Sequence, residues 1–168
     1  MPVLQSFKPI VGSHPRVMIL GSMPGVASLD AQQYYAHPRN AFWPIMAELF
    51  DVEWSGDYAQ RVVQFQRLPL VLWDVLHNCQ RKGSLDADIE THNLVPNDIV
   101  QMLQDYPAIS LIAFNGATAQ QLFRRHVLPR LAQARELELL RLPSTSPANA
   151  RLDLAAKLDQ WRVLLHYL

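Results

Sequence analysis

The sequence is poor in cysteine and lysine and has no excess of either charge. Cys79 is the only cysteine among 168 residues, which excludes an intrachain disulfide and a cysteine-bound iron–sulfur cluster. Fifteen basic residues balance fifteen acidic ones, so any contact with a polyanion must come from local basic groups. Only three basic residues are lysines, and the excess of arginine favours bidentate contacts with phosphate, carboxylate or base edges, unless it reflects the composition of the source genome.

Long hydrophobic runs are also missing. No apolar stretch approaches the ~20 residues of a membrane span, and the first twelve residues lack the apolar centre of a signal peptide. These absences predict a cytoplasmic protein without a membrane segment. The six histidines show no HxxxH or HxH spacing and have no cysteine cluster beside them, so we expect neither a metal nor another cofactor.

Four short apolar runs alternate with helical patterns along the chain. The runs predict strands at residues 17–20, 70–73, 109–114 and 137–141. Apolar residues at helical spacing predict helices over 42–50, 99–106, 119–127 and 154–168. Strands that alternate with helices form parallel sheets covered on both faces. The sequence therefore predicts one α/β domain over residues 1–168, a three-layer α/β/α sandwich around a short four-stranded parallel sheet.

The unusual residues fall where the predicted strands end. Residues 21–25 (GSMPG) follow the first strand, Asp74 follows the second, Asn115 and Gly116 follow the third, and residues 142–149 (LPSTSPAN) follow the fourth. Residues 34–43 (YYAHPRNAFW), which carry four aromatic rings, lie between the first loop and the next helix. Ligand sites of open parallel sheets lie beyond the carboxyl ends of the strands, so this pattern indicates a site.

Each motif taken alone also has an ordinary structural explanation. Residues 21–25 match neither the Walker pattern nor GxGxxG and are equally typical of a tight turn. Asn40 precedes a helix, where asparagine is a favoured N-cap, and Phe42 is compatible with a core position. Asp74 is suited either to capping a turn or to acid–base chemistry. Ser22 is a candidate nucleophile, although the sequence has no GxSxG elbow.

Taken together and in this order, the motifs resemble the uracil-DNA glycosylase superfamily. The resemblance is strongest to its hypoxanthine (deoxyinosine) DNA glycosylase branch and runs from about Val17 to Asn149, with HPRNxFW and LPSTSPAN as its most specific parts. It implies a short parallel sheet between helices. It also implies a monomeric, monofunctional repair enzyme that flips a deaminated base out of DNA and hydrolyses its N-glycosidic bond.

The resemblance implies three sets of site residues. Asn40 is the expected catalytic residue, which orients a water molecule. Phe42 is expected to stack on the base, Asn115 to hydrogen-bond its edge, and the first loop to surround it; the base-binding set is Gly21, Ser22, Met23, Pro24, Gly25, Phe42 and Asn115. The expected DNA-binding set is Tyr35, His37, Arg39, Ser144, Ser146 and Asn149.

Two positions depart from the pattern of the relatives. Leu142 stands where many relatives have a histidine that stabilises the leaving base, and Asp74 stands where relatives that read uracil have an asparagine. Both departures favour a deaminated purine, hypoxanthine first, over uracil. Two other functions stay open at this point, namely a non-catalytic module that binds damaged DNA or nucleotides, and a small-molecule hydrolase that uses Ser22.

Overall fold

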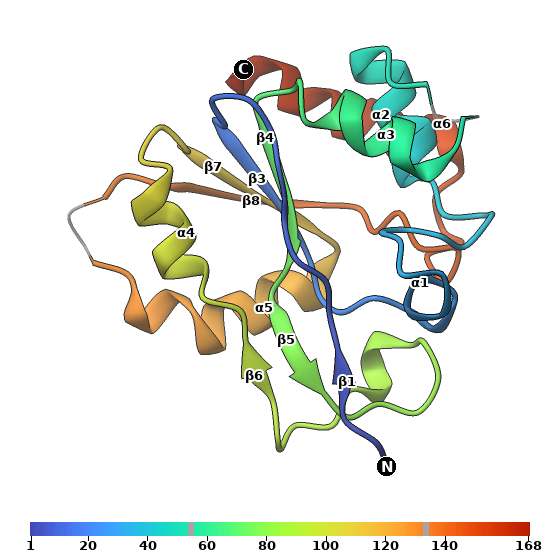
Figure 1. The fold of residues 1–168 in the computed structure, drawn as a ribbon, viewed down its shortest axis with the longest axis vertical. Coiled ribbons are helices and arrows are strands. Elements are labelled where there is room, and N and C mark those ends of the chain that lie inside the picture. The colour runs from blue at the N-terminus through green and yellow to red at the C-terminus, as the bar shows by residue number, and fades with distance from the viewer. Residues whose placement is uncertain (54–55, 133–134) are drawn as a thin grey trace.

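The computed structural model describes residues 1–53, 56–132 and 135–168, and its centre is a five-stranded sheet (Figure 1). The strand order is β2-β4-β3-β7-β8. β3 (Val17–Gly21) pairs in parallel with β4 (Leu70–Asp74) and β7 (Leu111–Asn115), and β8 (Glu138–Leu142) pairs in parallel with β7. The parallel strands are the four that the sequence predicted, which confirms the α/β class. The edge strand β2 (Ile10–Val11), antiparallel to β4, was not predicted.

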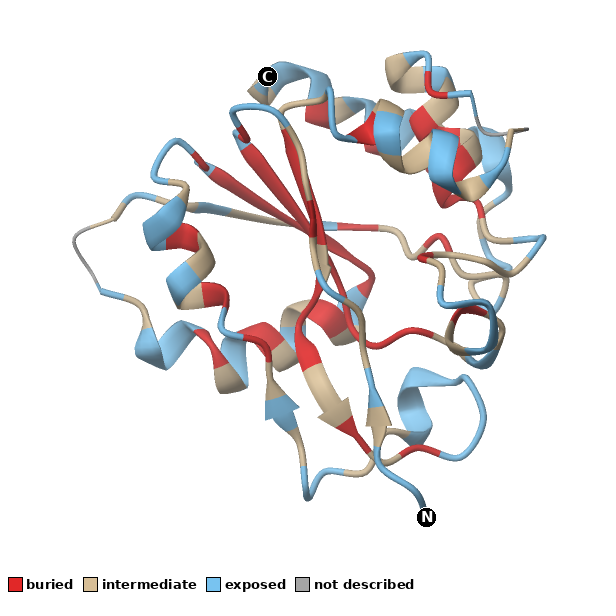
Figure 2. Cartoon of the chain, in the orientation of Figure 1, coloured by how far each residue is buried: buried red, intermediate tan, exposed pale blue. Residues whose placement is uncertain are grey.

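Helices cover both faces of this sheet, as the alternating side chains of the strands require. Val17 and Ile19 face one hydrophobic cluster while Met18 and Leu20 face the other, the period of two expected of a central strand. Figure 2 shows the buried positions concentrated along the central strands and on the helix sides that face them. The covering helices are α2 (Phe42–Phe50), α3 (Tyr58–Phe65) and α6 (Leu154–Trp161) on one side, and α4 (Ile99–Asp105) and α5 (Ala117–His126) on the other.

Some predicted bounds differ from the observed ones. β7 and β8 begin later than predicted, and the helix predicted over 154–168 consists of α6 followed by the 3-10 helix η3 (Arg162–Tyr167). The apolar stripe of that segment continues through both parts, because Trp161 and Leu164 are buried in the same cluster. The hydrophobic spacing therefore identified the buried face without revealing the change of helix type.

A second, antiparallel sheet was not predicted at all. It has the order β1-β5-β6, formed by β1 (Leu4–Gln5), β5 (Leu76–Cys79) and β6 (Val95–Pro96). β5 follows β4 after the single residue Val75, so the chain leaves the main sheet directly into this smaller one. The loop between β5 and β6, which includes η1 (Asp86–Asp88), is thereby placed beside the carboxyl ends of the main strands.

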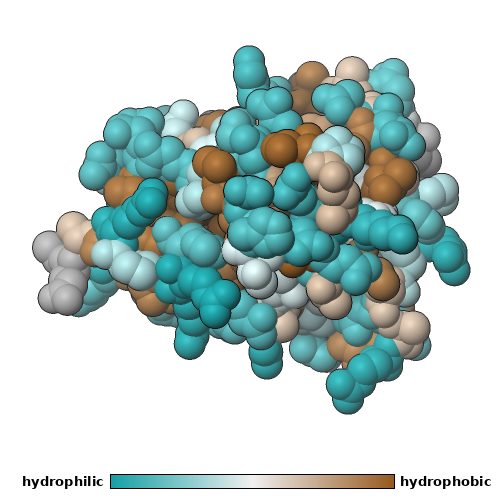
Figure 3. All heavy atoms as spheres, turned by 90° about the horizontal axis from the view of Figure 1, so that it is seen from below, coloured by the Kyte–Doolittle hydropathy of each residue, from teal (hydrophilic) through white to brown (hydrophobic). Residues whose placement is uncertain are grey.

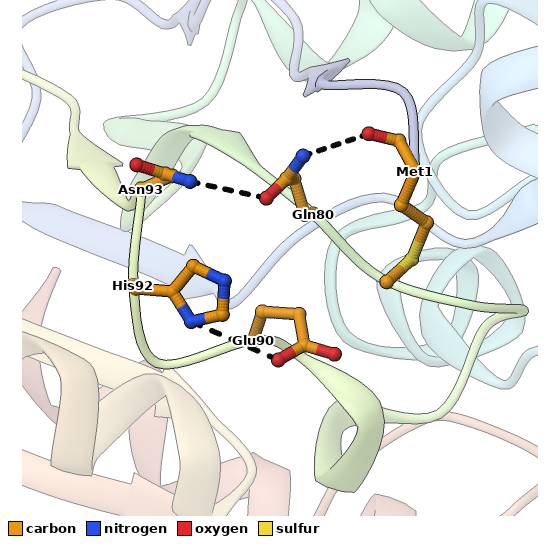
Figure 4. Close-up of polar contacts among 5 residues, drawn as sticks. All are labelled: Met1, Gln80, Glu90, His92 and Asn93. Carbon is orange, nitrogen blue, oxygen red and sulfur yellow. Dashed lines mark hydrogen bonds and ion pairs between the residues drawn. The ribbon is translucent and has the colours of Figure 1, made fainter.

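The small sheet is joined to the start of the chain by side-chain contacts. Gln80 Nε2 donates to the Met1 carbonyl at 2.7 Å, and Gln80 Oε1 accepts from Asn93 Nδ2 at 3.2 Å (Figure 4). In the same loop, His92 Nδ1 lies 3.9 Å from Glu90 Oε2. The side of the molecule shown in Figure 3 is mainly hydrophilic, with separate hydrophobic patches. The contact between Gln80 and Asn93 joins the two ends of the loop between β5 and β6.

Candidate active site

A cavity of about 650 Å³ lies at the carboxyl ends of the main strands. Five separate stretches and Asp74 line it: residues 21–28, 34–40 in part, 84–86, 115–118 and 144–149. Every predicted site residue lines this cavity except Phe42 and Arg39. The position is the one expected for open parallel sheets. The motifs therefore do converge, although they are up to 128 residues apart in the sequence (Gly21 to Asn149).

The first loop approaches the cavity closely because β3 ends in a glycine. A Cβ atom at Gly21 would lie 2.5 Å from Asp74 Oδ1 and 3.0 Å from the Tyr35 hydroxyl, so a larger residue here would force the Asp74 side chain to shift. Ser22 is buried and its Oγ donates to Asp86 Oδ1 at 2.6 Å. Its partner is a carboxyl group and not an imidazole, and the geometry gives no support to Ser22 as the nucleophile of a hydrolase.

Asn40 lines the cavity and also contacts the start of α2. Asn40 Oδ1 accepts a hydrogen bond from the backbone amide of Phe42 at 2.9 Å. The backbone amide of Asn40 donates to the His37 carbonyl, also at 2.9 Å. The helix N-cap is Ala41, so Asn40 satisfies a first-turn amide from one position further out. Within the described part of the chain, Asn40 Nδ2 donates to no hydrogen-bond acceptor. The side chain is thus fixed through its oxygen, with its amide nitrogen available.

Tyr35 forms part of the cavity wall, and Phe42 lies behind it. The two rings are stacked with centroids 4.3 Å apart and an interplanar angle of 29°. Phe42 is fully buried and meets Trp43 and Trp161 edge-on in the core. It begins α2, whose buried side packs on the sheet, so stacking of Phe42 on a base would require Tyr35 to move. Tyr35 adopts φ 55°, a strained value for a residue with a side chain.

Asn115 connects three parts of the site. Its Nδ2 donates to the Tyr35 hydroxyl at 3.1 Å and to Thr145 Oγ1 at 2.9 Å, while its Oδ1 accepts from the Thr145 amide at 2.9 Å. Both amide protons are therefore used within the protein, and only Oδ1 keeps capacity for a ligand. Thr145 is fully buried, and the sequence alone gives no sign of this role because the neighbouring Ser144 and Ser146 also carry hydroxyl groups.

The last loop is held mainly by its own hydrogen bonds. Ser144 Oγ accepts from the Ser146 amide and Ser146 Oγ accepts from the Ala148 amide, each at 3.2 Å. Asn149 Nδ2 donates to the Ser144 carbonyl at 3.1 Å, and Lys157 Nζ donates to the Ser146 carbonyl at 3.2 Å. The serine hydroxyls thus shape the loop while their residues line the cavity.

Two acidic residues line the cavity, the buried Asp74 and the exposed Asp86. Asp74 is only 4% exposed, and burial, with the nearby charge of Asp86, raises its pKa from 3.8 to about 7 in spite of Arg81. Arg81 donates from Nη2 to the Pro24 carbonyl at 2.6 Å and from Nε to the Gly83 carbonyl at 2.8 Å. Arg81 and Asp86 were not predicted as site residues, because a polar segment between two strands gives no sign that it reaches the cavity.

Over residues 1–53, 56–132 and 135–168, no group of three or more histidine, cysteine, aspartate or glutamate side chains is placed to hold a metal ion. No helix in the described ranges is long and apolar enough to cross a membrane.

Comparison with known proteins assigns the chain to a family. The model of the uracil DNA glycosylase superfamily matches residues 9–165. A hypoxanthine DNA glycosylase of Methanosarcina barkeri is 31% identical over 113 residues, which cover 67% of this chain and 70% of the relative. A hypoxanthine DNA glycosylase of Methanosarcina acetivorans is 29% identical over 150 residues, 89% and 90% of the two chains.

A solved structure agrees with this assignment. The solution NMR structure of a candidate uracil DNA glycosylase from M. acetivorans superposes with a TM-score of 0.74 and 27% identity, covering 98% of this chain and all of that one. This chain therefore belongs to the uracil DNA glycosylase superfamily, a family of hydrolases that act on N-glycosyl bonds in DNA. The membership confirms the resemblance inferred from the five motifs.

Proposed function

We propose that this protein is a monofunctional DNA glycosylase that excises hypoxanthine from DNA. The observation that carries the proposal is the convergence of Asn40, Tyr35 and Asn115 on one cavity at the carboxyl ends of the strands. The names of the two Methanosarcina relatives support hypoxanthine as the base. A cavity of about 650 Å³ leaves room for an extruded purine together with part of its sugar.

The wall of the cavity supports a role for Tyr35 in holding the extruded base. A base inside a duplex is unreachable, so glycosylases rotate it out and hold it by stacking and by contacts to its edges. Of residues 34–43, the tyrosines Tyr34 and Tyr35 line the cavity, and Phe42 stacks behind Tyr35 and keeps its ring in place. In this proposal Phe42 does not contact the base but supports the ring of Tyr35 that does. The free lone pair of Asn115 Oδ1 accepts a hydrogen bond from the edge of the base.

Asn40 is suited to guide the attacking water. Its side chain carries no charge and cannot remove a proton as a carboxylate does, but a fixed amide can orient water toward C1′. The oxygen is held by the Phe42 amide, which fixes the direction of Nδ2. As the N-glycosidic bond breaks, the sugar becomes oxocarbenium-like and negative charge moves onto the base, where backbone amides of residues 21–25 can offset it.

The DNA backbone is proposed to contact the rim of the cavity. Arg39 is exposed beside it, and His37 lines it, so both are placed to meet phosphates. Ser144, Ser146 and Asn149 lie on the opposite loop and offer neutral groups to the backbone. Contacts of this kind position the duplex without reading its sequence.

The direct test is base release from defined duplexes. The protein is incubated with duplexes that contain one hypoxanthine, uracil or xanthine, and abasic sites are detected by alkaline cleavage. We expect release of hypoxanthine at the highest rate, and loss of release in the Asn40→Ala variant prepared in parallel. Binding of a hypoxanthine duplex without any abasic product would instead support a damage-binding module and overturn the proposal.

A further inference from the structure

We propose that Asp74 is a general acid for the leaving base, donating its proton to N7 of the extruded purine as the bond between N9 and C1′ breaks. The inference rests on the proposed glycosylase function and extends it to how the base departs and why it is a purine. N7 belongs to the same ring as N9 and is absent from pyrimidines. An acid directed to N7 would therefore accelerate release of a purine and not of uracil.

The position of the Asp74 carboxyl is the first observation. Asp74 ends β4 and lines the cavity at its inner end, with only 4% of its surface exposed. Its Oδ2 is buried and has no hydrogen-bond partner in the described part of the chain. An unpartnered buried carboxyl is costly and is rare unless a ligand or proton satisfies it. Gly21, whose Cβ would lie 2.5 Å from Oδ1, keeps a side chain away from this carboxyl.

The groups around Asp74 favour its protonated form. The ionisable groups that affect its charge or are affected by it are Asp86, Arg81, Tyr34 and Tyr35. The carboxyl of Asp86 disfavours a second negative charge, and burial raises the pKa of both tyrosines so that they stay neutral. Arg81 is the nearby cation and acts against this effect by lowering the pKa of Asp74. Its Nε and Nη2 are bonded to the carbonyls of Gly83 and Pro24, and its buried Nη1 has no hydrogen-bond partner in the described part of the chain.

The chemistry of the carboxyl group itself suits this step. A protonated carboxyl offers one donor and one acceptor, as an amide does, but can also transfer its proton. With a pKa of about 7, a large fraction of Asp74 holds a proton near neutral pH.

The step balances in atoms and electrons. The electron pair of the N9–C1′ bond moves to the base as the Asp74 proton moves to N7, so hypoxanthine leaves as a neutral molecule. The water held by Asn40 then bonds to C1′, and the proton that it loses returns to the Asp74 carboxylate through solvent. One water is consumed, and the products are a free base and an abasic sugar with a hydroxyl at C1′.

The test compares two substrates and two variants under single-turnover conditions. Release is measured from duplexes with hypoxanthine or 7-deazahypoxanthine, in which a carbon replaces N7, while the pH is raised through about 7. We expect the parent rate on hypoxanthine to fall as Asp74 loses its proton. Asp74→Asn should lose about 10²–10⁴ in rate on hypoxanthine and should not show this fall. On 7-deazahypoxanthine, parent and Asp74→Asn should release base at similar, low rates.

Asp86→Asn is the matched control in the same cavity. It keeps an acceptor for Ser22 but removes a charge that raises the pKa of Asp74, so the fall in rate should move to lower pH. An unchanged rate and pH profile in Asp74→Asn would overturn the inference, as would an equal loss on both substrates. In those cases hypoxanthine release by the parent would leave the proposed function standing. A parent that releases no base would remove both.

Discussion

The hydroxyl of Tyr35 accepts a hydrogen bond from Asn115 Nδ2 at 3.1 Å. This contact joins the segment before α2 to the end of β7. The same amide nitrogen donates to Thr145 Oγ1, so the segment that carries Tyr35, the end of β7 and the loop after β8 share one hydrogen-bonded junction. This junction fixes the aromatic ring of the cavity wall before any ligand arrives. A preformed wall reduces the ordering cost of binding an extruded base.

The first prediction concerns the ring of Tyr35. Stacking of a base on an aromatic ring contributes roughly 1–3 kcal/mol, so Tyr35→Ala should weaken binding of a hypoxanthine duplex by a corresponding factor. Tyr35→Phe keeps the ring and loses the bond to Asn115, and it should retain most of the binding. Fluorescence anisotropy titrations of the three proteins measure the difference. Equal affinity of Tyr35→Ala and the parent would remove Tyr35 from the base contact.

The second prediction separates Phe42 from Tyr35. Phe42 is fully buried between Tyr35, Trp43 and Trp161, so Phe42→Ala should cost roughly 3–5 kcal/mol of unfolding free energy. Phe42→Leu fills more of the space and should cost less. Denaturant unfolding measures both. A Phe42→Ala variant with parental stability but poor base release would instead place this ring in direct contact with the base.

The sequence predicted the main sheet well because its strands are almost continuously apolar. Residues 17–20 and 70–73 have no polar side chain to suggest another structure, and strands buried on both faces read this way. It predicted the cavity-lining loops because glycine, proline and asparagine follow those strands at the expected edge. It left two positions open for Phe42, in the core or against the base, because spacing shows that a ring belongs to a helix but not whether another ring covers it.

The parts that were missed depend on contacts between distant residues. β1, β2 and β6 are two residues long, too short for a periodic pattern, and they exist because partner strands are nearby. Arg81 and Asp86 lie in a polar segment that reads as a solvated loop. Their proximity to Ser22 and Pro24 follows from the second sheet, which no local pattern specifies.

The third prediction concerns Asn40. Asn40→Ala should lower single-turnover release of hypoxanthine by ~10²–10³, the usual effect of losing one positioned polar group at a reaction centre. Asn40→Asp is the informative companion, since it keeps an oxygen for the Phe42 amide but loses the amide nitrogen. It should therefore melt near the parent while releasing base slowly. Parental activity in both variants would leave Asn40 with its structural contact to α2 alone.

The fourth prediction is a pH dependence of stability that comes from Asp74. Its pKa rises from 3.8 in the unfolded chain to about 7 in the folded protein, so between these values the folded state holds a proton that the unfolded state has released. The free energy of unfolding should then decrease as pH rises through this window. The free energy of unfolding of Asp74→Asn should depend less on pH. As pH rises, the stability of the variant should therefore increase relative to that of the parent. Parallel curves over the window would contradict the raised pKa.

The last prediction concerns Ser144 and Ser146, which we expect to act in DNA binding and not in chemistry. Their hydroxyls accept from backbone amides of their own loop, so replacing both with alanine should loosen that loop at the rim of the cavity. Binding should weaken similarly for hypoxanthine, uracil and undamaged duplexes, because backbone contacts carry no base information.

The measurement that separates binding from chemistry is release at saturating enzyme. There the double serine variant should lose much less rate than Asn40→Ala, since excess enzyme compensates for weak binding. Its salt dependence should stay close to that of the parent, because neutral hydroxyls displace no counterions, whereas Arg39→Ala should reduce the slope by roughly 0.9 if it neutralises one phosphate. A double serine variant that binds all duplexes normally but releases no base would move these residues into the catalytic set. Such a result would also shift attention to the Ser146 carbonyl, which Lys157 holds from α6.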